Sequence, residues 1–166
     1  MQSMSKNQRA VTRNRKIGFV FQNYNLLPKT TAVENVELPL LYNSSVGARE
    51  RREKAIAALK AVGLGERLNH KSNQMSGGQQ QRVAIARALI AKPDIIFADE
   101  PTGNLDSKSG SEVMKMLCGI REKMNKTLVV ITHDPQIAKM AARRFTIVDG
   151  VLLEAAAPSE GYGKVW

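Results

Sequence analysis

The feature that most constrains the fold of this chain is a pair of short, almost uninterrupted apolar runs at residues 94–99 and 127–132. Strands covered on one face alternate apolar and polar residues, whereas strands buried on both faces of a parallel sheet do not. A third run, at residues 16–21, is rich in β-branched and aromatic residues. The sequence therefore predicts a parallel sheet in which the strands at 94–99 and 127–132 are covered on both faces.

Helical patterns separate these strands, and this alternation indicates an α/β fold. The segment 48–62 repeats apolar residues at helical spacing and is followed by Gly63 and Gly65, which favour the end of a helix. Similar patterns predict three further helices, at residues 79–91, at residues 107–123 with Ser107 or Ser109 as the N-cap, and at residues 134–143.

The remaining segments complete the predicted organisation. Residues 145–148 and 151–153 are expected to form a hairpin around a tight turn at Asp149 and Gly150. Residues 28–75 have no strong strand pattern, which predicts a helical subdomain, at about residues 28–90, inserted in the α/β core. Residues 155–166 are expected to be a C-terminal tail of a single domain spanning 1–166.

Length and composition fit one globular domain. The chain has 166 residues, of which 43% are hydrophobic, and this is enough for a core. It contains no apolar run of about 18 residues that could cross a membrane, and residues 1–16 lack the apolar stretch of a signal peptide. Its single cysteine, Cys118, is expected to be a small buried apolar residue. These features predict a cytoplasmic protein.

The chain is strongly basic, with 25 Lys and Arg against 15 Asp and Glu, a net charge of +10. The basic residues gather at 6–16, 49–54 and 143–144. Such a balance fits a solvated surface, and also contact with nucleic acid, an anionic membrane surface or a phosphate-rich ligand. The low aromatic content, 5%, argues against nucleic acid, because single-stranded bases are recognised largely by stacking.

Two adjacent carboxylates, Asp99 and Glu100, end the apolar run at 94–99 and precede Pro101-Thr102-Gly103. Ligands bind at the carboxyl edge of open α/β sheets. One carboxylate at this edge could support Mg²⁺ while the other orients a water for phosphoryl transfer. Alternatively, an acidic residue there could simply cap the following turn.

Two further segments could contact phosphate. Ser76-Gly77-Gly78-Gln79 precedes a predicted helix, whose free N–H groups would attract an anion, although a plain glycine-rich N-cap has the same composition. His133 follows the strand at 127–132 and is expected at the same edge as Asp99. His70 has no such setting and is expected to be a surface residue.

Five segments follow one another along the chain: Phe21-Gln22, residues 75–79, residues 95–100, Asn104-Leu105-Asp106, and His133. In this order they resemble the Q-loop, the signature, the Walker B strand, the D-loop and the switch histidine of the ATP-binding cassette (ABC) ATPases. Met75 stands where the family usually has Leu, which is a mild departure. The residues at 18–28 and 98–106 are similar to a narrower group, the macrolide-exporter and lipoprotein-release type of bacterial transporter ATPase.

The resemblance implies a P-loop NTPase-like ABC ATPase core, with a parallel sheet plus a helical subdomain, and ATP and Mg²⁺ as cofactors. It implies two partners, a second ABC ATPase subunit and a transmembrane permease subunit met by the helical lobe, on the inner face of the cell membrane. The implied roles are Glu100 for activating water, Asp99 and Gln22 for supporting Mg²⁺, Gln22 also for sensing the attacking water, His133 for holding the γ-phosphate, Ser76, Gly77, Gly78 and Gln79 for contacting ATP of the partner subunit, and Asp106 for the dimer interface.

One element of the family pattern is missing from the sequence. None of the twelve glycines has another glycine five positions on, so the 166 residues contain no phosphate-binding loop of the form G-x-x-x-x-G-K-[ST]. The resemblance therefore describes a cassette whose N-terminal strands and phosphate loop are missing, with its first third lost. We expect negligible ATP hydrolysis by this chain alone, and poor solubility because part of the sheet would be uncovered.

Three functions follow as hypotheses. The first is the ATP-binding subunit of a transporter, coupling ATP hydrolysis to export or lipoprotein release. The second is a non-catalytic partner subunit or gene fragment that supplies the signature motif to another cassette, and the missing loop favours it for this chain. The third, an ABC-type ATPase of DNA repair or translation, is disfavoured because those proteins usually carry long coiled-coil insertions or tandem cassettes.

Overall fold

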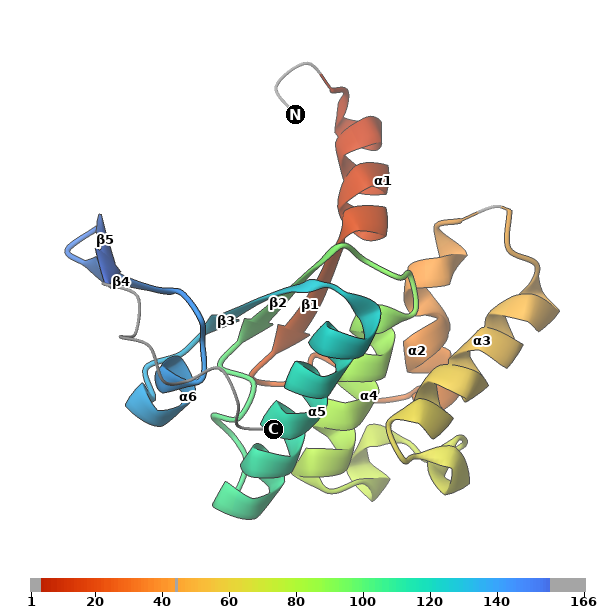
Figure 1. The fold of residues 1–166 in the computed structure, drawn as a ribbon. Helices are drawn as coiled ribbons and strands as arrows, with labels where there is room; N and C mark the ends of the chain where they lie inside the picture. Colours follow the sequence, from red (N-terminus) through yellow and green to blue (C-terminus); the bar gives the residue numbers. More distant parts are fainter. Residues whose placement is uncertain (1–3, 44, 156–166) are drawn as a thin grey trace. The chain divides into compact units, whose positions relative to one another are not determined.

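The computed structural model describes residues 4–43 and 45–155 (Figure 1). The chain divides into two compact units, Met1–Ile131 and Thr132–Trp166, which are called here the first and second units. The first unit contains a sheet and most of the helices, and the second contains a short helix and a hairpin. The predicted tail at 155–166 lies outside the described residues except for Ala155.

Three parallel strands form the sheet of the first unit: β1 (Ile17–Phe21), β2 (Ile95–Asp99) and β3 (Thr127–Ile131). Their order is β1-β2-β3, so β2 lies in the centre. The register aligns Phe21 with Asp99 and Asp99 with Ile131, so that all three strands end at the same level. The strands at all three predicted runs are confirmed.

One face of the sheet is covered by α4 (Gly77–Leu89) and α5 (Ser107–Met124), as Figure 1 shows. On this face Val20, Ile96 and Ala98 are fully buried. The opposite face is open in the part of the chain that the structure describes: Phe19 is 38% exposed and Val129 36% exposed. The prediction that both apolar runs are covered on both faces is therefore wrong for the described residues, since their composition does not specify what packs against them.

The residues between β1 and α4 form a helical lobe, as predicted. It contains α2 (Ala32–Leu41) and α3 (Ala48–Ala61), followed by two short 3₁₀ turns, Gly65–Arg67 and Ser72–Gln74. The sequence patterns identified α3 but not α2, which begins with a capping box in which Thr31 and Glu34 bond each other's backbone N–H. An isolated antiparallel bridge between Thr31 and Lys71 brings the two ends of the lobe together.

The caps of α4 and α5 differ from the prediction. Helix α4 begins at Gly77, two residues earlier than expected, because Ser76 is its N-cap and forms a capping box with Gln79. In α5 the N-cap is Asp106, whose carboxylate accepts the backbone N–H of Ser109, and neither predicted serine fills this role. Cys118 of α5 is only half-buried, so its assignment to the core was wrong.

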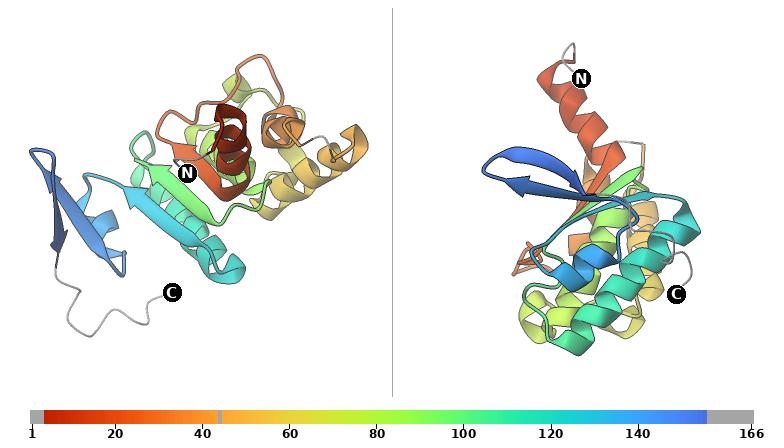
Figure 2. Two further views of the ribbon diagram at one scale, coloured as in Figure 1. Left: turned by 90° about the horizontal axis from the view of Figure 1, so that it is seen from above. Right: turned by 60° about the vertical axis from the view of Figure 1, so that its left-hand side comes forward.

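Helix α1 (Lys6–Lys16) was not predicted from the sequence. Its N-terminus is closed by a capping box between Ser5 and Gln8, yet the helix buries none of its residues. Figures 1 and 2 show it standing away from the other elements of the first unit. A helix that packs no apolar face against the core leaves no apolar periodicity in the sequence, which explains why it was missed.

The second unit contains α6 (Pro135–Lys139) and a hairpin of β4 (Arg144–Val148) and β5 (Val151–Ala155). The hairpin is confirmed, and its turn residues Asp149 and Gly150 both have positive φ, at 51° and 80°. Helix α6 begins at Pro135 as predicted but ends at Lys139, and nothing in the local sequence explains the early end. Within the described residues, no helix is both long and apolar enough to span a membrane.

Candidate functional site

The carboxyl edge of the sheet gathers the predicted site residues of the first unit. Because Phe21 and Asp99 are aligned in the register, Gln22 and Glu100 are the residues that directly follow at the ends of two adjacent parallel strands. Asp99 is exposed, and Gln22 and Glu100 are half-buried. The structure thus brings together three of the residues proposed to act on Mg²⁺ and water.

Glu100 turns the chain away from the sheet. Its φ is +44°, in the left-handed region that residues other than glycine seldom adopt. The turn is held because the Glu100 N–H donates to the carbonyl of Ile131 at 2.9 Å and the Glu100 carbonyl accepts from Gly103 at 3.1 Å. A strained backbone conformation at this position fits a functional site, where neighbouring structure holds it in place.

Gln22 is fixed by the loop that follows β2. Its side-chain amide donates to Oδ1 of Asn104 at 3.3 Å, and the Asn104 amide donates to the Gln22 carbonyl at 3.2 Å and to Oδ1 of Asn23 at 2.7 Å. A Cβ on Gly103 would lie 2.6 Å from Nε2 of Gln22. Glycine at 103 therefore leaves the space that the Gln22 side chain occupies.

The glycines of the signature segment lie against the same loop. A Cβ on Gly77 would lie 2.7 Å from the hydroxyl of Tyr24 and 3.3 Å from the side chain of Leu105. A Cβ on Gly78 would lie 3.3 Å from the side chain of Ser109. These contacts explain on packing grounds why both positions are glycine, and they place the N-terminus of α4 beside residues 104–109.

The side chains of Ser76 and Gln79 each bond the backbone of the other residue. The Ser76 hydroxyl accepts the Gln79 N–H at 3.3 Å, and the Gln79 side-chain oxygen accepts the Ser76 N–H at 3.0 Å. Ser76 is exposed and Gln79 half-buried, so both could also reach a ligand. The interpretation of this segment as a helix N-cap is therefore compatible with the interpretation that it contacts phosphate.

Arg87 of α4 holds the segment that follows Gln22, a role that none of the sequence motifs predicted. Its guanidinium donates to the carbonyls of Tyr24, at 2.7 Å, and Asn25, at 2.5 Å. Tyr24 and Asn25 both have positive φ, at 60° and 47°. Burial lowers the pKa of Arg87 and raises the pKa of Tyr24. The one available sequence signal was Asn25, since asparagine tolerates the left-handed region.

Gln81 links α4 to the turn after Glu100. It is fully buried, and its Nε2 donates to the carbonyl of Pro101 at 2.7 Å. Its Oε1 has no hydrogen-bond partner among the described residues. Gln81 stands three positions before Ala84 and seven before Ala88, on the apolar face of α4. This spacing is the sequence signal that indicates its burial.

Asp106 and the two histidines complete the predicted set. The backbone N–H of Ser109 lowers the pKa of the Asp106 carboxyl. His133 belongs to the second unit and follows β3 by two residues along the chain. His70 is half-buried and lies 2.8 Å from the guanidinium of Arg67.

The donor set at the sheet edge suits Mg²⁺. Asp99, Glu100 and Gln22 offer carboxylate and amide oxygens, the ligand type that this hard cation prefers. No group of three or more His, Cys, Asp and Glu side chains that could enclose a metal occurs within residues 4–43 and 45–155. Such a site fits a cation that keeps waters and phosphate oxygens as its other ligands, which is usual for Mg²⁺.

Comparison with known proteins agrees with this geometry. A family model described as ABC transporter matches residues 1–103. The chain is 53% identical over 150 residues to the macrolide export ATP-binding/permease protein MacB of Syntrophobacter fumaroxidans, which covers 90% of this chain and 21% of that protein. It is 55% identical over 147 residues to an uncharacterized ABC transporter ATP-binding protein of Thermotoga maritima, covering 89% of this chain and 62% of that protein.

A solved structure gives the same result for the fold. The model matches the ATP-binding cassette MJ0796 of Methanocaldococcus jannaschii, determined as a dimer in a post-hydrolysis state bound to ADP and Pi, with a TM-score of 0.78 and 46% identity. The match covers 92% of this chain and 68% of that one. The chain spans less than two thirds of either sequence relative. Its α/β architecture is that of an ABC ATPase cassette, and the chain belongs to the ABC transporter family.

Proposed function

We propose that this chain serves as nucleotide-binding machinery of an ABC transporter of the macrolide-export or lipoprotein-release type. The observation that carries the proposal is the network joining three motifs: Gln22 bonds Asn104, Tyr24 donates to the Asn104 carbonyl at 3.3 Å, and Gly77 lies against Tyr24. The network couples the end of β1, the loop after β2 and the start of α4. A displacement of one of these three segments would therefore alter the contacts of the other two.

The roles of the carboxyl-edge residues follow from their chemistry. Asp99 and Gln22 would hold Mg²⁺, which when bound neutralises charge on the phosphates of ATP. Glu100 would accept a hydrogen bond from the attacking water and orient it. His133 would donate a ring N–H to the γ-phosphate.

The signature segment would act on a second cassette. Ser76, Gly77, Gly78 and Gln79 begin a helix of 13 residues, and helix N-termini favour anions. We propose that these residues contact the ATP bound by the partner ATPase subunit, with Asp106 at the dimer interface. The helical lobe with α2 and α3 would meet the permease subunit, placing the protein at the inner face of the membrane.

The missing loop limits what these 166 residues do alone. A phosphate loop supplies charge-assisted hydrogen bonds, worth roughly 1.5–3 kcal/mol each. Without two or three of them ATP binding weakens by about 10³-fold or more, at about 1.4 kcal/mol per tenfold. We therefore expect this polypeptide to complete the site of an intact cassette rather than to hydrolyse ATP by itself.

The test is phosphate release from MgATP by an equimolar mixture with an intact cassette of the family. That cassette carries arginine in place of its own signature serine and is inactive as a homodimer. The wild-type polypeptide should restore release, and Ser76→Arg should not. Glu100→Gln should restore release as well as wild type, because Glu100 belongs to the other site.

Two results would contradict the proposal: no restoration by wild type, or equal restoration by Ser76→Arg. Circular dichroism of Ser76→Arg checks that α4 still forms, since the substitution also removes an N-cap. Phosphate release by the polypeptide alone that disappears in Glu100→Gln would contradict only the expectation that it cannot act by itself.

A further inference from the structure

Helix α1 carries a concentration of positive charge that the proposed nucleotide chemistry does not use. Its eleven residues include Lys6, Arg9, Arg13, Arg15 and Lys16 and no acidic residue. All five basic side chains are exposed. Of the described residues, only Asp94 forms an ion pair with this helix, through Lys16 at 2.6 Å.

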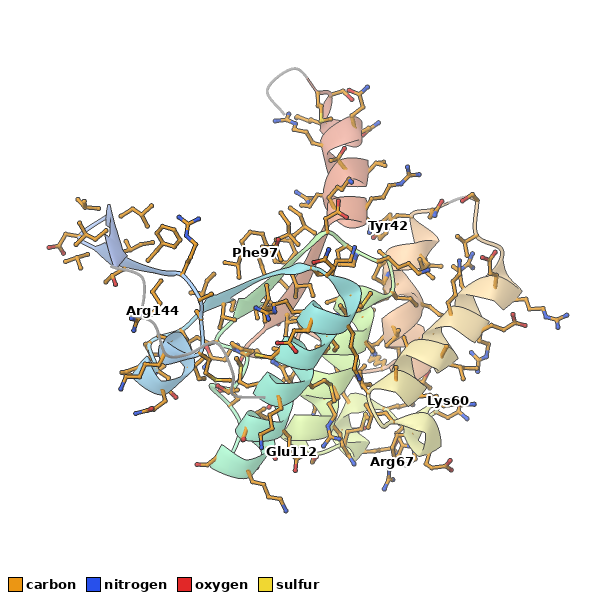
Figure 3. All side chains as sticks on the ribbon, viewed as in Figure 1. Tyr42, Lys60, Arg67, Phe97, Glu112 and Arg144 are labelled. Carbon is orange, nitrogen blue, oxygen red and sulfur yellow. The ribbon has the colours of Figure 1, made fainter. Side chains whose placement is uncertain are left out.

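Four of the five charges lie towards one side of the helix, with Lys16 about 20° beyond the other three and paired with Asp94. At about 100° per residue, Lys6, Arg9 and Arg13 fall within an arc of roughly 60°. Arg15 points in a different direction, about 120° or more from that arc. Lys6, Arg9 and Arg13 are defined here as the basic face of α1. They have no acidic side chain within ion-pair distance among the described residues. Figure 3 draws the side chains that project from α1.

Helix α1 lacks the packing that normally stabilises a helix of this length. None of its residues is buried, and isolated helices shorter than about 12–15 residues are marginal in water. Its one large apolar residue, Val11, is 45% exposed. An external surface that binds this helix would therefore stabilise it.

The position of α1 indicates what that surface is. A groove of about 600 Å³ is lined by Arg13 and Asn14 of α1, by β1, and by Pro39 and Tyr42 on α2. Tyr42 is 80% exposed. Helix α1 thus flanks the lobe that is proposed above to meet the permease, and that contact would bring α1 close to the membrane.

We propose that the basic face of α1 binds the anionic headgroups of a lipid bilayer. Juxtamembrane lysine and arginine residues are attracted to anionic leaflets, and the attraction falls off within a Debye length. A helix with few apolar residues would lie at the headgroups and not insert. The proposal rests on the proposed function for the direction of the membrane, but the binding itself requires no nucleotide or permease.

The test is flotation of the purified polypeptide with vesicles in a density gradient, a method in which aggregates sink and vesicle-bound protein rises. Vesicles of phosphatidylcholine alone are compared with vesicles containing about 30% phosphatidylglycerol, at low salt and at roughly 0.15 M salt. The variant Lys6→Gln/Arg9→Gln/Arg13→Gln removes the basic face. The control Arg49→Gln/Arg52→Gln/Lys54→Gln removes the same number of charges from α3.

Wild type should float only with the anionic vesicles. Each basic residue contributes about fivefold to such partitioning, so the α1 variant should bind about 100-fold more weakly at low salt. The α3 control should keep most of its binding. Equal losses in both variants would mean that net charge alone drives binding, and this would overturn the proposal.

A second arm addresses nucleic acid, the other polyanion that a basic helix could bind. A single-stranded RNA oligonucleotide is titrated into the same proteins without vesicles. RNA binding that depends on the basic face, together with no flotation of wild type, would assign α1 to nucleic acid and overturn the lipid proposal. ATP-dependent complementation is measured separately, so a failure here leaves the proposed function standing.

Discussion

Gln22 and Asn104 form two hydrogen bonds with each other across the carboxyl edge of the sheet. The Gln22 amide donates to the Asn104 side-chain oxygen at 3.3 Å, and the Asn104 amide donates to the Gln22 carbonyl at 3.2 Å. The two residues are 82 positions apart in the chain. This pair, and not either motif alone, determines where the amide of Gln22 lies.

Replacing Asn104 should release Gln22. Asn104→Ala removes three side-chain hydrogen bonds at an exposed position, with an expected loss in the free energy of unfolding of about 1–2 kcal/mol. The side-chain amide resonances of Gln22 should shift towards those of a solvated glutamine in NMR spectra. Asn73→Ala, at an exposed site without a side-chain bond to any described residue, is the control and should leave these resonances unchanged.

Two glycine substitutions should have opposite effects on stability. A Cβ at Gly18 would lie 2.5 Å from the backbone carbonyl of Ala88, so Gly18→Ala must separate β1 from α4 and should cost about 1–3 kcal/mol. Gly119 lies inside α5 with open space around it, so Gly119→Ala should stabilise by about 1 kcal/mol. Urea unfolding monitored by circular dichroism measures both. Equal effects would show that the contact of Gly18 with α4 is unimportant.

Removing Arg87 should destabilise the turn after Gln22. Arg87→Met keeps much of the side-chain volume but leaves the carbonyls of Tyr24 and Asn25 without their donor, and we expect a loss of about 2–3 kcal/mol. Hydrogen exchange at residues 22–27 should accelerate more than exchange in α3. Arg15→Met on the exposed side of α1 is the matched control, and a similar loss there would argue against a specific role for Arg87.

The stability of the first unit should depend on Asp106 at acidic pH. The pKa of this carboxyl is lowered in the folded state, first because the Ser109 backbone N–H donates to it. Its stabilising contribution is therefore present above the unfolded pKa, about 3.9, and is lost as the pH falls through the lower folded value. Asp106→Asn keeps an N-cap acceptor but does not titrate. Below about pH 4 the urea midpoint of the wild type should fall relative to that of Asp106→Asn. A constant difference between the two midpoints across this pH range would contradict the assignment.

The sequence could predict whatever depends on local patterns. The strands, α3, α4, α5 and the hairpin follow from apolar periodicity and from turn residues such as Asp149-Gly150. The caps at Ser76 and Asp106 are local as well, although choosing among neighbouring Ser and Asp residues needed the backbone. Helix α1 was not predicted because it has no buried side chain, and the α2 pattern is interrupted by Pro39.

The contacts that build the site could not be predicted in this way. Arg87 and Tyr24 are 63 positions apart, and Gln81 and Pro101 come from different elements. The family resemblance named the motif residues, but neither Arg87 nor Tyr24 belongs to those motifs. Local patterns also could not predict the open face of the sheet. The composition of a strand indicates that the strand can be buried, but it does not indicate which element covers it.

The bridge between Thr31 and Lys71 has a consequence for how this architecture can vary. The Ala32 N–H donates to the carbonyl of His70 at 2.9 Å, and the Val33 N–H donates to that of Leu68 at 3.0 Å, so the lobe leaves and rejoins the main body at one place. A segment whose ends meet can be lengthened, shortened or exchanged with little effect on the rest of the chain. The lobe is thus a module that can change in length while the strands of the sheet stay unchanged.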